Sequence, residues 1–106
     1  MTNRMKVAVI CAIALSTAAS VPAQDSGAAT YKSKCAMCHG ADGLGATPAG
    51  KSMGAIAFNS PDLVKASDAD LIAATKSGKG KMPAYSGKLT DPQIAQAITY
   101  IRTLQK

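Results

Sequence analysis

The sequence predicts an all-α fold of three to five short helices in one small domain. Nowhere in its 106 residues do apolar and polar side chains alternate for long enough to form a sheet. Capping residues and prolines mark several helix starts, and the last of these segments carries an apolar stripe with helical spacing. Internal repeats are absent, so a solenoid is not expected.

The first residues of the chain, 1–23, are typical of a secretory signal peptide. Arg4 and Lys6 give it a positive start, an apolar run follows, and small residues lead up to Ala23. The apolar run is about thirteen residues long, whereas a membrane-spanning helix needs roughly twenty. An uncleaved membrane anchor is the alternative. We therefore expect export to the periplasm and a mature domain over residues 24–106.

The first helix of that domain is expected to begin at Ser26, a good N-cap residue, and to lead into Cys35. Six glycine and proline residues then fall between Gly40 and Gly54. This density favours a loop wrapped closely around another group.

Two short helices are expected in the middle of the chain. Residues 60–64 contain a Ser-Pro-Asp start and form a short helical turn. Ser67 with Asp70 resembles a capping box, and the helix that it begins ends near Gly78. A second loop, 79–87, follows.

The last helix has the clearest pattern. Asp91 is the expected N-cap, with Pro92 in the first turn. Its apolar residues recur on one face, which we expect to be buried. They are Ile94, Ala97, Ile98, Ile101 and Leu104.

Residues 35–39 read Cys-Ala-Met-Cys-His, a pattern typical of covalent haem c attachment. Cys35 and Cys38 lie three positions apart on a helical turn, so both thiols can add across the two vinyl groups of one porphyrin. His39 can then offer its neutral imidazole to the iron as an axial ligand.

Two other uses of this motif lack the residues that they need. A structural zinc site takes four ligands, but His39 is the only histidine and Cys11 the only further cysteine. A thioredoxin-like dithiol pair needs a preceding strand, whereas a helical stretch rich in small residues leads to Cys35. Once Cys11 is lost with the signal peptide, no disulfide framework can form.

The mature domain is short of large apolar side chains. Only 18 of its 83 residues are large and apolar, among them one Phe, three Tyr and no Trp. These are too few for a core made of protein alone. A buried haem would supply the missing apolar volume.

The mature chain is moderately basic, with ten Lys and Arg against six Asp, a net charge of +4. Its lysines gather beside the motif and around the second loop, where they could guide an acidic redox partner. A well-solvated surface explains them equally well. These lysines are Lys32, Lys34, Lys76, Lys79, Lys81 and Lys88.

Nucleotides and nucleic acids are not expected ligands. Residues 45–52 match the phosphate-loop pattern G-x-x-x-x-G-K-S, but no hydrophobic strand precedes them and the domain is too small for the α/β fold required. Nucleic-acid binding has neither a recognisable module nor basic residues interleaved with aromatic ones.

The second axial position decides between electron transfer and ligand binding. Met37 lies inside the attachment turn, and Met53 comes only fourteen residues after His39. Met82 comes forty-three residues after His39 and is followed by Pro83, which stiffens its loop. We expect Met82 to ligate the iron and Met53 to be a flexible core filler.

The mature chain resembles the small class I c-type cytochromes of bacteria and is similar to the cytochrome c6 and c5 types. Residues 35–40 and 81–85 carry the resemblance most specifically, supported by residues 89–91 and by Tyr100 in the last helix. The resemblance implies a small cytochrome c fold wrapped around one covalently bound haem c.

The resemblance also implies particular contacts. The first helix would cross the last one, with Gly27 and Tyr31 against Ala97 and Tyr100. The carbonyl group of Pro48 would accept a hydrogen bond from the His39 ring. Further residues expected to bind the cofactor are Phe58, Asn59 and Tyr85.

The expected function is that of a soluble one-electron carrier, not an enzyme, with His39 and Met82 as the iron ligands. The alternative is a haem-based sensor or peroxidase-like module in which Met82 is labile or does not ligate. The expected partners are a redox-protein donor and acceptor. We expect a monomer that meets the membrane only through a partner complex.

Overall fold

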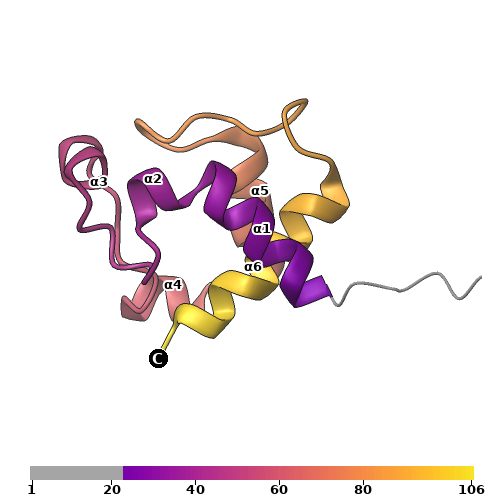
Figure 1. Cartoon of the computed structure of the whole chain (residues 1–106), viewed down its shortest axis with the longest axis horizontal. Coiled ribbons are helices and arrows are strands. Elements are labelled where there is room, and N and C mark those ends of the chain that lie inside the picture. Colours follow the sequence, from indigo (N-terminus) through magenta and orange to yellow (C-terminus); the bar gives the residue numbers. More distant parts are fainter. Residues whose placement is uncertain (1–22) are drawn as a thin grey trace, which may run out of the picture.

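The computed structural model describes residues 23–106, and this part of the chain contains six α-helices and no named strand (Figure 1). The all-α prediction is confirmed, although there is one helix more than the three to five expected. The helices are α1 (Ala23–Lys34), α2 (Ala36–His39), α3 (Pro48–Met53), α4 (Pro61–Lys65), α5 (Asp68–Ser77) and α6 (Asp91–Leu104).

The signal peptide predicted over 1–23 falls almost wholly on residues 1–22, which lie outside the described residues. Among residues 23–106, no helix combines the length and the apolar character needed to cross a membrane. The cleavage site after Ala23 therefore stays a prediction.

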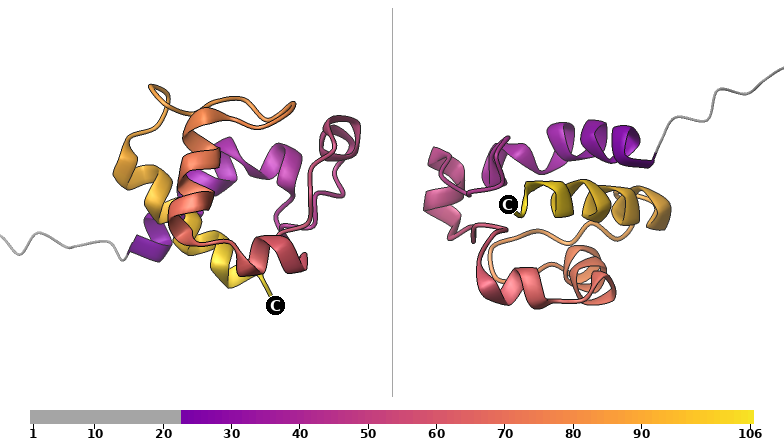
Figure 2. Two further views of the ribbon diagram at one scale, coloured as in Figure 1. Left: turned by 180° about the vertical axis from the view of Figure 1, so that it is seen from behind. Right: turned by 90° about the horizontal axis from the view of Figure 1, so that it is seen from below.

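Helix α6 lies at the centre of the fold. Seen from below, α1 covers one side of it, and the segment with α4 and α5 covers the other (Figure 2, right). The predicted apolar stripe is confirmed for four of its five residues, since Ile94, Ala97, Ile98 and Ile101 are buried, and Leu104 is half-buried against the same core. The central position of α6 explains why this stripe is the strongest helical pattern in the sequence.

The crossing of α1 over α6 depends on a glycine. A Cβ atom at Gly27 would overlap the carbonyl group of Gln96 and lie 3.2 Å from Cβ of Tyr100. The close approach lets the fully buried ring of Tyr31 pack against that of Tyr100, with centroids 5.2 Å apart. Ala97 is buried in α6 as expected. The crossing that the resemblance implies is therefore confirmed.

Two predicted helix starts are wrong by a few residues. Helix α1 begins at Ala23, so Ser26 lies inside the helix and is not its cap. Helix α6 is capped by Thr90 and not by Asp91, because the Thr90 hydroxyl accepts from the N–H of Gln93 while the Gln93 side chain accepts from the N–H of Thr90. This is a complete capping box.

Helix α3 lies within the stretch that the glycine content predicted to be a loop. Thr47 caps it by accepting a hydrogen bond from the N–H of Gly50, and Pro48 occupies its first turn. Gly54 ends it with a φ of 71°, a left-handed conformation that suits glycine. The same glycines and proline that argued for a loop therefore begin and end a short helix.

Helix α3 also explains the phosphate-loop resemblance in structural terms. A Cβ atom at Gly50 would overlap the carbonyl group of Cys38, so this glycine allows α3 to pack directly on α2. No strand precedes the segment in the described chain. The glycine thus serves packing beside the Cys-x-x-Cys-His turn.

Candidate cofactor site

A cavity of about 360 Å³ lies between α2, α5, α6 and the loop that precedes α6. Its size is within the range of small-molecule and cofactor sites. The predicted attachment and ligand residues Cys35, Cys38, His39 and Met82 all line it. The rest of the wall is mainly apolar and includes Ile56, Phe58, Leu63, Leu71, Leu89, Ala97, Ile98 and Ile101.

The two thiols lie at the junction of α1 and α2. Cys35 occupies the turn between the helices, and its carbonyl accepts from the N–H of His39, 2.9 Å away, so that Cys38 and His39 follow on one helical turn. Both cysteines are unpaired. Burial, with a smaller contribution from Cys38, raises the pKa of the Cys35 thiol to about 11. A reactive dithiol needs a lowered pKa, so the site does not favour thiol redox chemistry.

The imidazole of His39 lies against an aromatic wall. The ring of Phe58 stacks on it, with centroids 4.5 Å apart and an angle of 23° between the planes. Burial lowers the pKa of His39, so the neutral imidazole, which is the metal-ligating form, is favoured.

The hydrogen bond implied between His39 and Pro48 is not formed. Nδ1 of His39 is buried and has no hydrogen-bond partner among the described residues. Pro48 is the first residue of α3, where carbonyl groups point along the helix toward the N–H four residues later. The position of Pro48 in a helix that the sequence did not predict accounts for the difference.

Met82 lies on the loop between α5 and α6, and hydrogen bonds hold this loop at Met82 itself and at Tyr85, three residues later. The N–H of Met82 donates to the carbonyl of Lys79 over 3.0 Å, and the reverse bond is 3.2 Å. Tyr85 donates from its hydroxyl to the carbonyl of Lys34, 2.9 Å away, at the end of α1. The tyrosine therefore ties the Met82 loop to the residue that precedes Cys35.

Tyr85 lines the cavity, as expected of a cofactor-binding residue. Burial raises the pKa of its hydroxyl, with smaller contributions from Cys35 and Cys38. The phenol is therefore a neutral donor at neutral pH.

Asn59 does not reach the site. It is exposed and is not among the residues that line the cavity, so its assignment to the cofactor pocket stays a prediction that this arrangement does not favour. Its neighbour Phe58 turns inward instead, held by a hydrogen bond from its N–H to the carbonyl of Gly43. The two residues lie in a turn that the N–H of Ser60 closes by donating to the carbonyl of Ala57, 3.1 Å away, and only Phe58 is turned toward the cavity.

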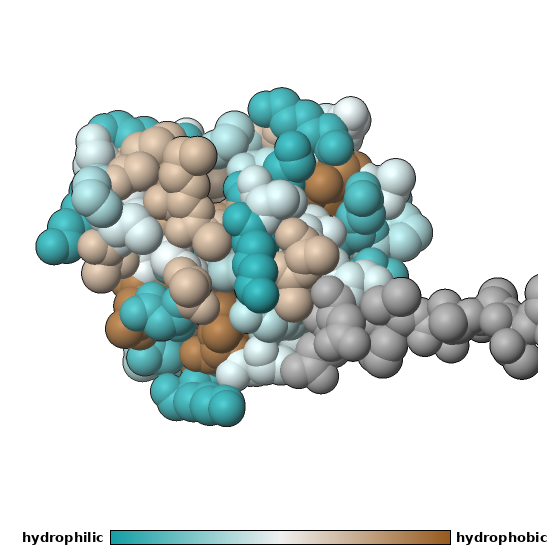
Figure 3. All heavy atoms as spheres, viewed as in Figure 1, coloured by the Kyte–Doolittle hydropathy of each residue, from teal (hydrophilic) through white to brown (hydrophobic). Residues whose placement is uncertain are grey.

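Met53 is not a core filler, because its side chain is 38% exposed. It lies at the rim of the cavity, with its Sδ 4.0 Å from Sγ of Cys38. On the face shown in Figure 3, moderately apolar residues gather at the upper left, over the region of α2 and α3, with hydrophilic residues around them.

Sequence reasoning missed two groups of residues at this site. The hydroxyl of Thr47 donates to the carbonyls of Met37 and Cys38, at 2.7 and 2.9 Å, and so supports the attachment turn. A threonine before a proline signals a helix cap and could have revealed this role. The α6 stripe was assigned to the core, but Ala97, Ile98 and Ile101 also form the cavity wall.

The donor set fits a haem group. Two unpaired thiols, one imidazole and the thioethers of Met53 and Met82 line a single mainly apolar cavity, and this combination suits a macrocycle tethered through sulfur and ligated by imidazole and thioether. Among the described residues, no group of three or more His, Cys, Asp or Glu side chains could hold a metal ion without such a macrocycle.

Comparisons with known proteins agree with this chemistry. Residues 22–101 match the family described as cytochrome c oxidase, cbb3-type, subunit III. The chain is 35% identical to cytochrome c6 of Leptolyngbya boryana over 77 residues, which cover 71% of this chain and 85% of that protein. It is 39% identical to cytochrome c-555 of Chlorobaculum thiosulfatiphilum over 80 residues, covering 71% of this chain and 88% of the relative.

A solved structure has the same architecture. The c-type cytochrome KustC0563 superimposes with a TM-score of 0.69 and 29% sequence identity, covering 76% of this chain and 98% of its own. The likeness therefore extends over nearly all of that protein.

Proposed function

Since the chain belongs to the small class I c-type cytochromes and is a haem c electron carrier, we propose that it works in the periplasm with His/Met axial ligation. Cys35 and Cys38 hold the macrocycle through thioether bonds. His39 and Met82 would supply the two protein ligands of the iron.

One observation carries this proposal. The four residues come from α2, from the turn before it and from the loop before α6, yet all four line one cavity with a mainly apolar wall. Met53, the rival for the second axial position, lies at the rim beside Cys38 and is more than one-third exposed. This arrangement favours Met82.

The chain's own residues determine how the site works. Haem c, when bound, supplies the one-electron chemistry, with iron alternating between Fe(III) and Fe(II). The thioether of Met82 favours the reduced metal and raises the reduction potential. With both His39 and Met82 bound to the iron, these two residues would leave no coordination position open to oxygen or peroxide. The apolar wall keeps water away and adds to the preference for the less charged state.

We propose that residues 1–23 are a cleaved signal peptide and that residues 24–106 form the mature cytochrome domain. Removal of Cys11 would then leave only the two attachment cysteines. The partners are redox proteins that donate and accept one electron, and the net charge of +4 favours acidic docking surfaces. Lys34, Lys79 and Lys81 lie at the cavity and would face such a partner.

The test is an optical spectrum of the exported protein in both oxidation states, with and without carbon monoxide. We expect a low-spin spectrum, a weak ferric sulfur-to-iron band and no response of the ferrous form to carbon monoxide. Rapid carbon monoxide binding would instead favour a sensor or peroxidase-like module. Mass spectrometry of the same sample measures the cleavage site and the covalent attachment.

Two methionine variants make the assignment specific. Met82→Ala is expected to lose the sulfur-to-iron band, to bind carbon monoxide and to have a lower reduction potential. Met53→Ala, the matched control at the cavity rim, is expected to keep the wild-type spectrum. The opposite pattern would assign the axial position to Met53.

A further inference from the structure

Phe58 is held in place from both sides of its backbone. Its N–H donates to the carbonyl of Gly43, 2.9 Å away, and its carbonyl accepts from Nε2 of Gln105 at 3.0 Å. Its ring stacks on His39 and also makes an edge contact with Tyr31, at a centroid distance of 6.2 Å. The placement of this ring against the imidazole therefore depends on what holds the Phe58 backbone.

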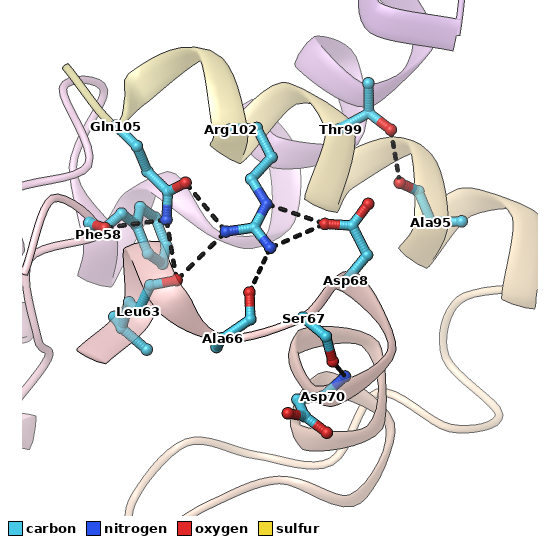
Figure 4. A network of polar contacts seen from close by, with 10 residues as sticks. All are labelled: Phe58, Leu63, Ala66, Ser67, Asp68, Asp70, Ala95, Thr99, Arg102 and Gln105. Carbon is cyan, nitrogen blue, oxygen red and sulfur yellow. Dashed lines mark hydrogen bonds and ion pairs between the residues drawn. The ribbon is translucent and has the colours of Figure 1, made fainter. Parts of the chain in front are cut away.

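Gln105 is itself oriented by three contacts. Its Oε1 accepts from Nη1 of Arg102 at 3.0 Å, while its Nε2 donates to the carbonyls of Phe58 and Leu63 at 3.0 and 3.3 Å. An amide that accepts on one side and donates on the other has only one favourable orientation. The amide group thus links the end of α6 to the segment that carries Phe58 (Figure 4).

Arg102 makes most of the hydrogen bonds in this network. Its guanidinium donates to the carbonyls of Leu63 and Ala66 at 3.2 and 2.6 Å, and forms an ion pair with Asp68 at 2.8 Å (Figure 4). The Arg102 side chain is only 27% exposed, whereas Asp68 is 64% exposed. Solvent screens the ion pair, so the hydrogen bonds to the two carbonyls hold Arg102 more firmly than the charge does.

We propose that Gln105, oriented by Arg102, is a positioning residue for His39, acting through the ring of Phe58. The proposal rests on the proposed function in one respect, the assignment of His39 as an iron ligand. Residues that contact a metal-ligating histidine set the orientation of its ring and so influence the reduction potential of the metal. In this chain Nδ1 of His39 has no hydrogen-bond partner among the described residues, and the contact that orients the imidazole is the stack of the Phe58 ring on its face.

The test compares two substitutions of the same kind in α6 and just after it. Gln105→Met keeps the length of the side chain but removes the hydrogen bonds to Arg102 and Phe58. Gln93→Met removes the amide of the capping box at the other end of α6, where the Gln93 side chain hydrogen-bonds to Thr90 and not to the Phe58 segment. Both variants lose stability, but only the first one touches the proposed link.

The readouts are the paramagnetically shifted proton resonances of the haem methyl groups and the His39 ring in the ferric holoprotein, and the reduction potential. We expect Gln105→Met to move these resonances and to shift the potential. Gln93→Met is expected to lower the melting temperature and to leave both readouts at wild-type values. Wild-type resonances in Gln105→Met, at a similar loss of stability, would overturn the proposal.

A second variant covers the case in which Gln105→Met does not incorporate haem. Gln105→Glu keeps an acceptor for Arg102 but has no amide N–H, so it loses the hydrogen bonds to the carbonyls of Phe58 and Leu63 and keeps the one from Arg102. It is expected to move the His39 resonances too, and unmoved resonances would again contradict the proposal. A failure of the proposed function is visible separately, as a wild-type spectrum without His/Met ligation.

Discussion

The aromatic ring of Phe58 lies almost parallel to the imidazole of His39, with 4.5 Å between the centroids and 23° between the planes. The two residues are nineteen positions apart in the sequence. The contact forms because the N–H of Phe58 donates to Gly43, which brings the returning chain back beside α2. The stack places an aromatic ring against one face of the histidine.

Removing the ring of Phe58 should loosen both the core and the site. Phe58→Ala is expected to lower the free energy of unfolding by about 3–5 kcal/mol, because a buried aromatic side chain is replaced by a cavity. Phe58→Leu keeps most of the volume and should cost less than about 1.5 kcal/mol. Guanidinium unfolding of the holoproteins measures both values, and equal losses would show that packing volume is not what Phe58 contributes.

Adding a single methyl group at the helix crossing should be costly. In Gly27→Ala the new Cβ meets the Gln96 carbonyl group, which is backbone and cannot rotate away. We expect a loss of about 1–3 kcal/mol, typical of overpacking. Ala29→Val adds two methyl groups at an exposed position of the same helix and should cost less than about 1 kcal/mol. Thermal unfolding followed by circular dichroism compares the two, and a larger effect at Ala29 would contradict the crossing geometry.

The hydroxyl of Thr47 is expected to matter more than its methyl group. Thr47→Val keeps the shape but removes the cap of α3 and the contacts with the carbonyls of Met37 and Cys38. Loss of an N-cap costs about 0.5–2 kcal/mol. Thr47→Ser restores the hydroxyl and should recover most of the stability. Denaturant unfolding of the three proteins tests this, and a serine variant as unstable as the valine one would refute the role of the hydroxyl.

The predictions that succeeded depend on short segments of the chain. The Cys-x-x-Cys-His turn and the apolar stripe of α6 each lie within one element, so their spacing alone indicates which side chains share a face. Thr90 and Gln93 show the same locality, since a capping box is complete within four residues. The one-residue error at this cap reflects two adjacent candidates, Thr90 and Asp91, of similar propensity.

The predictions that failed concern the segment between α2 and α4. Glycine content alone does not distinguish a loop from a short helix that has one glycine inside it and another after it. Here the close packing of Gly50 on the carbonyl of Cys38 favours the helix. Once α3 is formed, Pro48 belongs to a helix and is no longer placed to accept from His39. Met53, at the end of the same helix, comes to lie at the cavity rim instead of in the core.

By itself, the sequence determined the helical class, the attachment motif and the central helix, because each follows from spacing within one stretch of chain. Only the tertiary structure decided which distant residues support His39. Phe58 and not Asn59 faces the cavity, and Gln105, forty-seven residues further along the chain, holds the Phe58 carbonyl. Such contacts depend on how α6 packs against the α4 segment, and that packing is a property of the whole folded chain rather than of any local pattern.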